Sequence, residues 1–199
     1  MTEVPQEHLP REERRRRTEA TILEAARQLF AESGFERATI RAVAARAGID
    51  PALVMQYYGS KEGLFAAAAK WSGEHETVLG ASKDQVPAAA LRDMIEKFEG
   101  TGDREAAVAL MRNCLTHSEA SRIMRDEVMC HRVAGVARTI GGDDAELRAG
   151  LLGACMIGLG MARYLLEIPA VAGASREDVQ RLMEPVLRAL VDPPDADPA

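Results

Sequence analysis

Residues 39–58 read TIRAVAARAGIDPALVMQYY and predict two short helices joined by a tight turn. Thr39 is a residue type that caps helix N-termini, and Gly48, which tolerates a positive φ, can end the first helix. Asp50 can cap the second helix, with Pro51 at the first helical position, where the missing N–H costs no hydrogen bond. The spacing therefore predicts a helix-turn-helix unit.

The same stretch carries the small and apolar residues that such a unit needs. Ala44 stands where the second helix crosses the first closely, and the apolar residues at core positions are Ile40, Val43, Ile49 and Val54. The outer face of the second helix keeps Ala52, Gln56 and Tyr57 free, and in DNA-binding units this face enters the major groove. An ordinary helical hairpin has the same spacing, so the flanking sequence has to distinguish it from a DNA-binding unit.

Basic residues lie on both sides of this unit. The run Arg14–Arg17, with Arg16 and Arg17 at its end, precedes the apolar stripe Ile22–Phe30 and could reach a phosphate backbone or a minor groove. The alternative is a solvated charge run among neighbouring glutamates. Lys61 follows Ser60 at the start of the next helix, where free N–H groups and an ammonium can bind a phosphate. The alternative there is a routine capped helix start.

Composition favours a helical protein with unevenly distributed charge. Apolar residues make up 47% of the 199-residue chain, enough for a core, whereas aromatic residues make up only 4%. The net charge is −6, yet basic residues outnumber acidic ones by three over residues 11–70, and residues 71–199 carry −7. This asymmetry predicts a basic head, suited to phosphates, on an acidic body.

Cysteine usage and hydropathy indicate the compartment. Three widely spaced cysteines form neither a disulfide framework nor a CxxC pair, which is typical of a reducing environment. Residues 1–17 are polar and lack the apolar segment of a signal peptide. The most apolar stretch, Leu151 to Leu166, contains Arg163 and is shorter than a membrane span. We therefore expect a cytoplasmic protein without membrane contact.

No segment alternates convincingly with period two, so we expect an all-α fold of about nine helices. The expected divisions are a flexible arm at 1–10, a three-helix helix-turn-helix domain at 11–59, a helical body at 60–191 and a disordered tail at 192–199. Gly34 should end the first helix, with Phe35 packing back on it. Single helices are expected from Lys61 to about Gly80, from about Ser118 to Thr139, from about Asp143 to Leu166, and after a cap at Ser175.

The N-terminal region resembles the tetracycline-repressor (TetR) family over roughly residues 12–66. The residues that carry the resemblance are Ile22-Leu-Glu-Ala-Ala-Arg-Gln-Leu-Phe30, Gly34-Phe35, Thr39, Ile40, Val43-Ala44, Ala47-Gly48-Ile49, Tyr57-Tyr58-Gly59-Ser60-Lys61-Glu62 and Leu64. The rest of the chain is similar to the family only in length, helix content and helix order. The resemblance implies a homodimer that places two recognition helices in successive major grooves of a near-palindromic double-stranded DNA operator.

The resemblance also assigns contacts to DNA. Thr39 and Lys61 match phosphate contacts, and Arg41 matches a position that reaches a base or the backbone. The outer face of the recognition helix matches Pro51, Ala52, Leu53, Gln56 and Tyr57. The Gln56 amide suits an adenine, and Tyr57 a phosphate or sugar. Met55 stands where the family often has tyrosine, Tyr57-Tyr58 where it often has His-Phe, and Ala52 replaces a frequent glycine or serine, which leaves the operator sequence open.

The body is expected to enclose a site for a small, largely apolar effector, because flexible methionines suit an adaptable pocket. The candidate lining residues are Trp71, Phe98, Met111, Cys114, Met124, Val128 and His131. Each of them could equally be ordinary core. His117, Cys130 and His131 have no recognised metal-ligand spacing, so no metal and no cofactor are predicted. Effector binding would swing the helix Lys61–Gly80, which begins at the predicted DNA anchor.

A dimer seam is expected from the C-terminal helices. Residues 150–163 alternate small and large side chains, and small residues let helices approach closely. Together with the last helix they predict a four-helix seam, two helices from each chain. Its candidate residues are Gly153, Ile157, Gly160, Tyr164, Val179, Leu182, Val186 and Leu190. The alternative is a core helix within a monomer.

The sequence thus predicts a ligand-responsive, DNA-binding transcriptional regulator, a repressor released from its palindromic operator by the effector. It contains no nucleophile elbow, P-loop or HExxH motif, so no enzyme activity is predicted. Two alternatives stay open. The chain could be a ligand-sequestering or protein-binding module that has lost DNA binding, or an activator, because the sign of regulation depends on where the operator lies.

Overall fold

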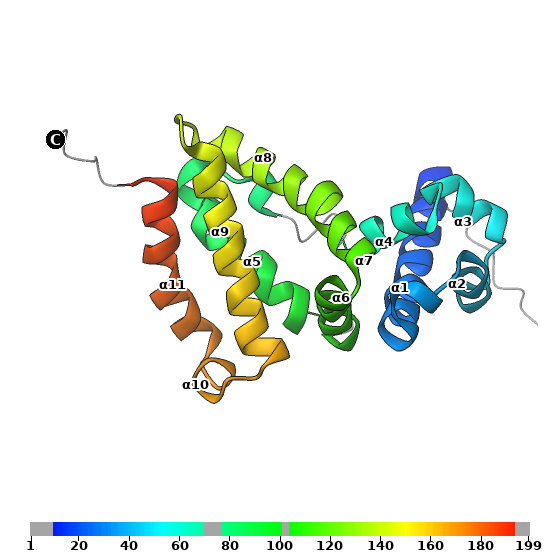
Figure 1. The fold of residues 1–199 in the computed structure, drawn as a ribbon. Coiled ribbons are helices and arrows are strands. Elements are labelled where there is room, and N and C mark those ends of the chain that lie inside the picture. The colour runs from blue at the N-terminus through cyan, green and yellow to red at the C-terminus, as the bar shows by residue number, and fades with distance from the viewer. Residues whose placement is uncertain (1–9, 70–76, 101–103, 194–199) are drawn as a thin grey trace, which may run out of the picture.

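The computed structural model describes residues 10–69, 77–100 and 104–193. Its α-helices are α1 (Arg11–Arg37), α2 (Ile40–Ala47), α3 (Pro51–Tyr58), α4 (Lys61–Ala69), α5 (Val86–Glu99), α6 (Arg104–Thr116), α7 (Ser118–Ile123), α8 (Cys130–Ile140), α9 (Ala145–Gly160), α10 (Pro169–Ala172) and α11 (Arg176–Val191). No strand occurs among the described residues, so the predicted all-α fold is confirmed. Helices α1 to α4 form a small head, and α5 to α11 form a larger body with α11 farthest from the head (Figure 1).

The first helix changes direction at Gly34. This residue has φ 74° and ψ 167°, which breaks the regular helix, and the chain after it turns back toward the head. Phe35 is therefore buried, with its ring centroid 6.0 Å from that of Phe30 and 5.1 Å from that of Phe65. The expected stop at Gly34 and the expected return of Phe35 are confirmed.

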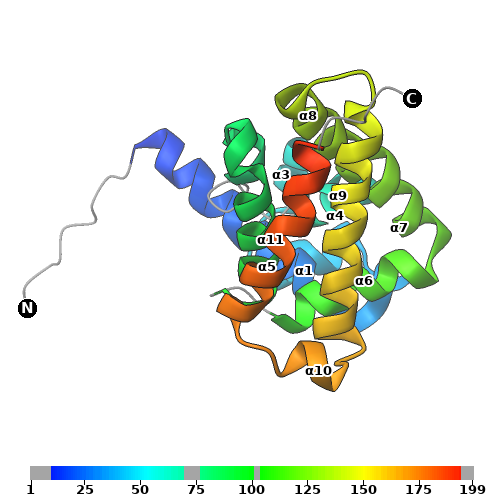
Figure 2. The ribbon, with the colours of Figure 1, turned by 90° about the vertical axis from the view of Figure 1, so that its left-hand side faces the viewer.

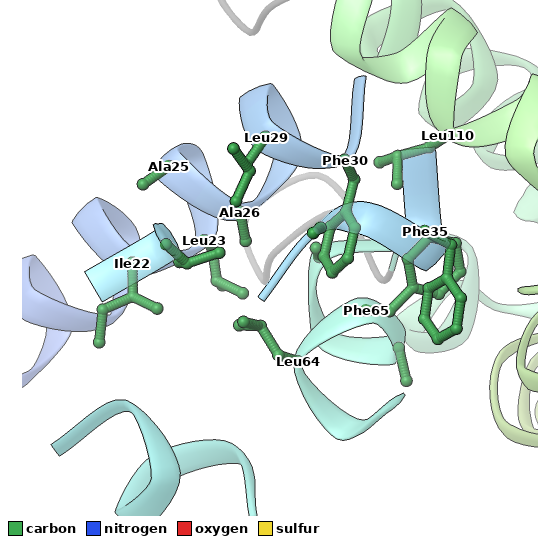
Figure 3. Close-up of a cluster of buried hydrophobic side chains, with 14 of the residues drawn as sticks. Ile22, Leu23, Ala25, Ala26, Leu29, Phe30, Phe35, Leu64, Phe65 and Leu110 are labelled. Atoms are coloured by element: carbon green, nitrogen blue, oxygen red, sulfur yellow. The ribbon is translucent and has the colours of Figure 1, made fainter. Parts of the chain in front are cut away.

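The core of the head is shared by helices on both sides of the predicted domain boundary. Ile22 and Phe30 of α1 pack with Leu64 and Phe65 of α4, and Leu110 of α6 reaches the same cluster (Figure 3). These five side chains are almost completely buried. The boundary between residues 59 and 60 stays a prediction, but the packing crosses it because α4 closes the core of the head.

The helix predicted from Lys61 to Gly80 does not extend that far. Thr77–Gly80 forms a separate 3₁₀ turn, η1, and the backbone N–H groups of Thr77 and Val78 each donate to the Asp93 carboxylate at 3.0 Å. A continuous α-helix would direct those groups to carbonyls four residues earlier. The predicted end at Gly80 is therefore wrong, and Trp71 lies outside the described residues. A second short turn, η2 (Lys83–Gln85), leads into α5.

Two long helices contain π-helical segments. Helices α7 and α8 are joined without a break by η3 (Met124–Met129), and α9 continues into η4 (Met161–Leu165). These continuous helices correspond to the single helices expected over about 118–139 and 143–166. A π segment widens the turn and shifts the side chains that follow around the helix axis. The register of α8 therefore differs from that of a regular helix begun at Ser118.

The C-terminal helices line one side of the body. Helices α9 and α11 lie side by side on the face turned toward the viewer in Figure 2. Ser175 caps α11, because its Oγ accepts from the Asp178 N–H at 3.0 Å, which confirms the expected cap. The short helix α10 was not predicted. The expected arm and tail fall almost entirely outside the described residues.

Candidate DNA-binding face and effector cavity

The turn between α2 and α3 has the geometry that the sequence predicts. Gly48 adopts a left-handed conformation, with φ 67° and ψ 31°, and the Ile49 N–H donates to the Ala44 carbonyl at 3.0 Å. Ala44 is fully buried, as are Val43 and Val54. A side chain larger than alanine at position 44 would separate the two helices, so these small and branched residues determine how α3 is presented.

Helix α3 exposes a continuous strip to solvent. Ala52, Met55 and Gln56 are exposed, and Pro51 is exposed at the first helical position. Leu53 and Tyr57, also predicted for the outer face, are half-buried at its edge. The Asp50 carboxylate caps the helix by accepting from the Ala52 N–H at 2.7 Å. The helix is thus fixed at its start and free along one side, as insertion into a groove requires.

Thr39 and Arg41 offer polar groups at the start of α2. Both are exposed, and the Thr39 hydroxyl oxygen accepts from the Ala42 N–H at 3.1 Å. This bond uses the oxygen of the hydroxyl and leaves its hydrogen for an outside acceptor such as a phosphate oxygen. The N-terminal end of α2 is therefore open to an outside ligand, as is the exposed strip of α3.

Arginines of α1 border α3 on the other side. The Arg15 guanidinium lies 5.7 Å from the centre of the Tyr57 ring, and a groove lined by both helices runs between them. Arg16 and Arg17 are exposed and form surface ion pairs with glutamates of the preceding turn, at 3.9 and 3.5 Å. Such exposed pairs contribute little to stability, so these arginines can exchange a glutamate for a phosphate.

Lys61 has a different position from the predicted phosphate anchor. Its Nζ donates to the carbonyl oxygens of Phe35 at 2.9 Å and Glu36 at 3.2 Å, and lies 4.4 Å from the centre of the Phe35 ring. The ammonium therefore holds the end of α1 against α4 with two of its three donors, and its contact with a phosphate stays a prediction. The Ser60 hydroxyl caps α4 by accepting from the Gly63 N–H at 3.0 Å, as the sequence predicts.

We expect Lys61→Ala to lower the unfolding free energy by about 1–2 kcal/mol, because two carbonyls at the end of α1 lose their donor. If holding α1 is the whole role of Lys61, the salt dependence of DNA binding should stay nearly unchanged. Chemical denaturation and a plot of log Kd against log salt concentration measure the two effects. Arg41→Ala is the control and should reduce the salt slope without destabilising the protein. A reduced slope with unchanged stability for Lys61→Ala would restore the phosphate-anchor assignment.

The body encloses a cavity of about 110 Å³ between α5, α6, α8 and α9. Its wall is mostly apolar and rich in methionine, and its larger side chains are Met94, Phe98, Met111, Met129 and Met156. Methionine side chains have several rotatable bonds, so a cavity of this composition can change shape around a ligand. Among the described residues no three His, Cys, Asp or Glu gather where they could hold a metal ion.

One end of the cavity is polar. Asp93 is buried and accepts from Thr77 Oγ1 at 2.7 Å and from Arg132 at 3.3 Å, in addition to the two N–H groups of η1. Lys97 lies one turn further along α5 on the same wall. These residues were not predicted from the sequence. Asp93 and Lys97 are four residues apart on α5 and directly precede or follow the buried apolar residues Met94, Ile95 and Phe98.

Only part of the predicted pocket lines this cavity. Phe98 and Met111 do, whereas Cys114 packs against the core of the head, where burial raises the pKa of its thiol to about 11. His131 is exposed, and Met124 and Val128 lie outside the cavity wall. The residues of this helix that do line it are Met129, Arg132, Val133 and Val136. The predicted stripe is thus shifted, because η3 changes the register that a regular helix would have.

The predicted dimer residues separate into two groups. Ile157 is 42%, Leu182 61% and Val186 50% exposed, and the exposed apolar residues Leu147 and Leu151 extend this face along α9. A Cβ added at Gly150 or Gly158 would meet no atom within 4 Å, so the backbone of α9 is open to a close neighbour. We call these side chains and glycines of α9 and α11 the apolar face.

The second group lies inside the chain. Gly160 is buried against the Phe98 ring and Met111, and Tyr164 is 4% exposed, with its ring stacked on Phe98 at 4.5 Å. Val179 is also buried, Gly153 faces the cavity beside Met129, and Leu190 is half-buried. Gly160, Tyr164 and Val179 are therefore wrong as surface residues of a dimer, since the body already covers them.

A partly buried ionic cluster ties η4, at the end of α9, to α5 and α11. Glu99 accepts from Tyr164 Oη at 2.5 Å, Arg163 Nε at 3.0 Å and Arg176 Nε at 2.6 Å. Burial alone would raise the pKa of Glu99, but these three donors outweigh it and lower the pKa. Arg163 also donates to the carbonyls of Val171 and Ala174, which holds the unpredicted helix α10 in place.

A helical head with an exposed recognition helix and basic flanks, joined to a helical body with a cavity, defines the helix-turn-helix class of transcriptional regulators. Known sequence families agree. "Bacterial regulatory proteins, tetR family" matches residues 22–68, and "Tetracyclin repressor-like, C-terminal domain" matches residues 84–191, which is more than half of the chain. The chain belongs to the TetR family.

Solved structures share the fold. A TetR-family regulator from Streptomyces coelicolor A3 is 27% identical with a TM-score of 0.51, and the match covers 96% of this chain and 99% of that one. NalD, the secondary repressor of the MexAB-OprM multidrug efflux pump in Pseudomonas aeruginosa, is 19% identical with a TM-score of 0.64, covering 90% and 99%. GusR of Salmonella enterica is 20% identical with a TM-score of 0.57, covering 86% and 95%. No match was found among curated proteins.

The family explains the most apolar helix. By length and composition, the stretch Ala145–Leu165 could cross a membrane, and only 28% of its most apolar 18-residue window is buried within the chain. TetR regulators are soluble DNA-binding proteins that act as dimers and bind operators and small-molecule effectors. They are generally not enzymes. The exposed apolar side chains of α9 are therefore part of the apolar face, and α9 is not a membrane span.

Proposed function

We propose that the protein is a cytoplasmic repressor that binds a near-palindromic operator as a homodimer and is released by a small, largely apolar effector. It is a regulator without enzyme activity. The head supplies the DNA-binding surface, with Thr39 and Arg41 beside the exposed strip of α3. The cavity supplies the effector site, and the apolar face supplies the contact between two chains.

The position of helix α6 between the cavity and the head is the observation that supports a response to a ligand. Within four residues it joins the core of the head through Leu110, lines the cavity through Met111, and binds α1 through Asn113. The Asn113 amide donates to the Phe30 carbonyl at 3.0 Å, and its oxygen accepts from the Phe35 N–H at 3.1 Å. A ligand that moves Met111 therefore acts on the helix that holds the break in α1.

This arrangement changes the expected route of coupling. The sequence-based hypothesis used the helix that begins at Lys61, reaching the cavity through Trp71, but residues 70–76 lie outside the described part of the chain. The described part of α4 does not line the cavity, whereas α6 does. We propose that α6 transmits effector binding and that α4 follows because Arg27 Nε of α1 donates to the Ala68 carbonyl at 3.1 Å. Coupling requires only that effector and operator favour different positions of α6.

DNA binding is tested by fluorescence anisotropy with duplexes selected by the protein from a random library and with fragments from beside its own gene. We expect selective binding that weakens steeply with salt, because exposed arginines of α1 and α2 are available to neutralise phosphates. Gln56→Ala should reduce selectivity, whereas Arg16→Ala should weaken all duplexes alike. Binding that is weak and indifferent to sequence on all selected duplexes would contradict the proposal and favour a module that has lost DNA binding.

The effector response is tested by screening small apolar compounds for release of the bound duplex. Gly153→Leu places a side chain in the cavity, where only the flexible end of Met129 lies close, at 3.3 Å from the added Cβ. This variant should bind DNA normally and lose the response to any active compound. Ala134→Leu, at an exposed position of α8 outside the cavity, is the matched control. An unchanged response in Gly153→Leu would place the effector elsewhere.

A further inference from the structure

The recognition helix contains no charged side chain. Residues Pro51 to Tyr58 read PALVMQYY, and the nearest acid, Asp50, is engaged in capping the helix at 2.7 Å from the Ala52 nitrogen. Guanine is read most often by arginine or lysine, and cytosine by an acidic oxygen. Helix α3 offers neither of these partners, so it lacks the strong readers of G·C pairs.

The side chains that α3 does expose share one strip. Ala52, Met55 and Gln56 are spaced i, i+3 and i+4, which places them on the same face of the helix, and Met55 is 44% exposed. Tyr57 and Leu53 lie toward the α1 groove, with Arg15 over the Tyr57 ring, and Gln56 lines the edge of the same groove. Beyond Pro51 at its first position, α3 therefore presents two apolar side chains and one amide outward.

This strip matches the chemistry of A·T pairs. In the major groove thymine offers a 5-methyl group to apolar contacts, and adenine offers an acceptor and a donor that fit a glutamine amide. Met55 is long and flexible enough to cover a methyl group, and Ala52 lies one turn closer to the start of the helix. The charged neighbours, Arg41 on α2 and the arginines of α1, can reach phosphates or flanking pairs.

We propose that Met55 and Ala52 read thymine 5-methyl groups, beside an adenine bound by Gln56, so that the part of each half-site under α3 consists of consecutive A·T pairs. The proposal rests on the DNA-binding function proposed above. It names Met55 as a specificity-determining residue. The Met55 side chain would contribute to binding by burying apolar surface against a methyl group and not by a hydrogen bond.

The test removes single methyl groups from the DNA. Starting from the tightest duplex selected from a random library, each thymine under α3 is replaced by deoxyuridine in both half-sites, and Kd is measured by anisotropy at fixed salt. At one or two positions we expect binding to weaken by about fourfold per half-site, the factor that corresponds to burial of one methyl-sized group. 5-Bromouracil, whose bromine occupies the place of the methyl group, should restore binding.

Met55→Ala links the effect to the protein. It should weaken binding to the thymine duplex and abolish the penalty for uracil at one position, without a change in melting temperature, because the side chain is exposed. Met55→Leu should retain both affinity and the uracil penalty. Tight, selective binding with no uracil effect at any thymine would overturn the inference and leave the regulator intact. A complete lack of selective binding would overturn the inference together with the proposed function.

Discussion

Leu182→Glu is expected to dissociate the homodimer and to weaken operator binding by about two orders of magnitude or more, because two linked heads bind far more tightly than one. Leu182 is 61% exposed on the α11 part of the apolar face, one turn from Val186. In the dimer a carboxylate at this position would be buried without a partner, which costs several kcal/mol. Light scattering after size-exclusion chromatography measures the mass, and fluorescence anisotropy measures the affinity for DNA.

Gln180→Glu is the matched control for this variant. It adds the same charge to the same helix, but position 180 lies on the opposite side of α11 from Leu182. The control should remain dimeric and bind DNA as the parent does. A Leu182→Glu protein that keeps the dimer mass and the operator affinity would show that the two chains meet elsewhere or that the monomer is the active form.

Asn113→Ala is expected to lower the unfolding free energy by about 2–4 kcal/mol, because it leaves buried backbone groups of α1 without partners. The Asn113 side chain is 6% exposed and bonds the Phe30 carbonyl, the Phe35 N–H and the Ala109 carbonyl. Loss of these bonds also frees the break in α1 from α6. The effector should then still bind, measured by calorimetry, but release the operator much less.

Arg112→Ala, an exposed neighbour on the same helix, controls for changes in α6 itself. It should leave both stability and effector response close to those of the parent. If Asn113→Ala is destabilised while the effector releases DNA as before, Asn113 has a structural role only, and the coupling route runs outside α6. A stability equal to that of the parent would contradict the hydrogen-bond assignment itself.

The head could be predicted from the sequence because its signals are local. Gly34 and Gly48 have positive φ values, which glycine adopts without strain, and Thr39, Asp50 and Ser60 cap the helices that they precede. Each of these signals acts over a few residues and therefore does not depend on the rest of the fold. Lys61 is the exception, because its partners, the carbonyls of Phe35 and Glu36, lie 25 or more residues away.

The cavity could be predicted only in outline. A methionine-rich body is visible in the composition, but the wall of the cavity depends on the rotation of each helix. The π segment η3 shifts Met129 and Arg132 into the wall in place of Val128 and His131. No periodicity in residues 118–139 marks that segment, since it arises from how α7 and α8 pack on different parts of the protein.

By itself the sequence determined the all-α class, the helix-turn-helix head and the family, because caps, glycines and helical periodicity act between near neighbours in the chain. The tertiary structure alone decided which apolar residues became interior and which remained on the surface. Tyr164 and Leu182 are both apolar enough for a core or an interface, yet the first is 4% and the second 61% exposed. Hydrophobic burial is non-directional, so only the packing of distant helices against one another assigns each side chain to one place or the other.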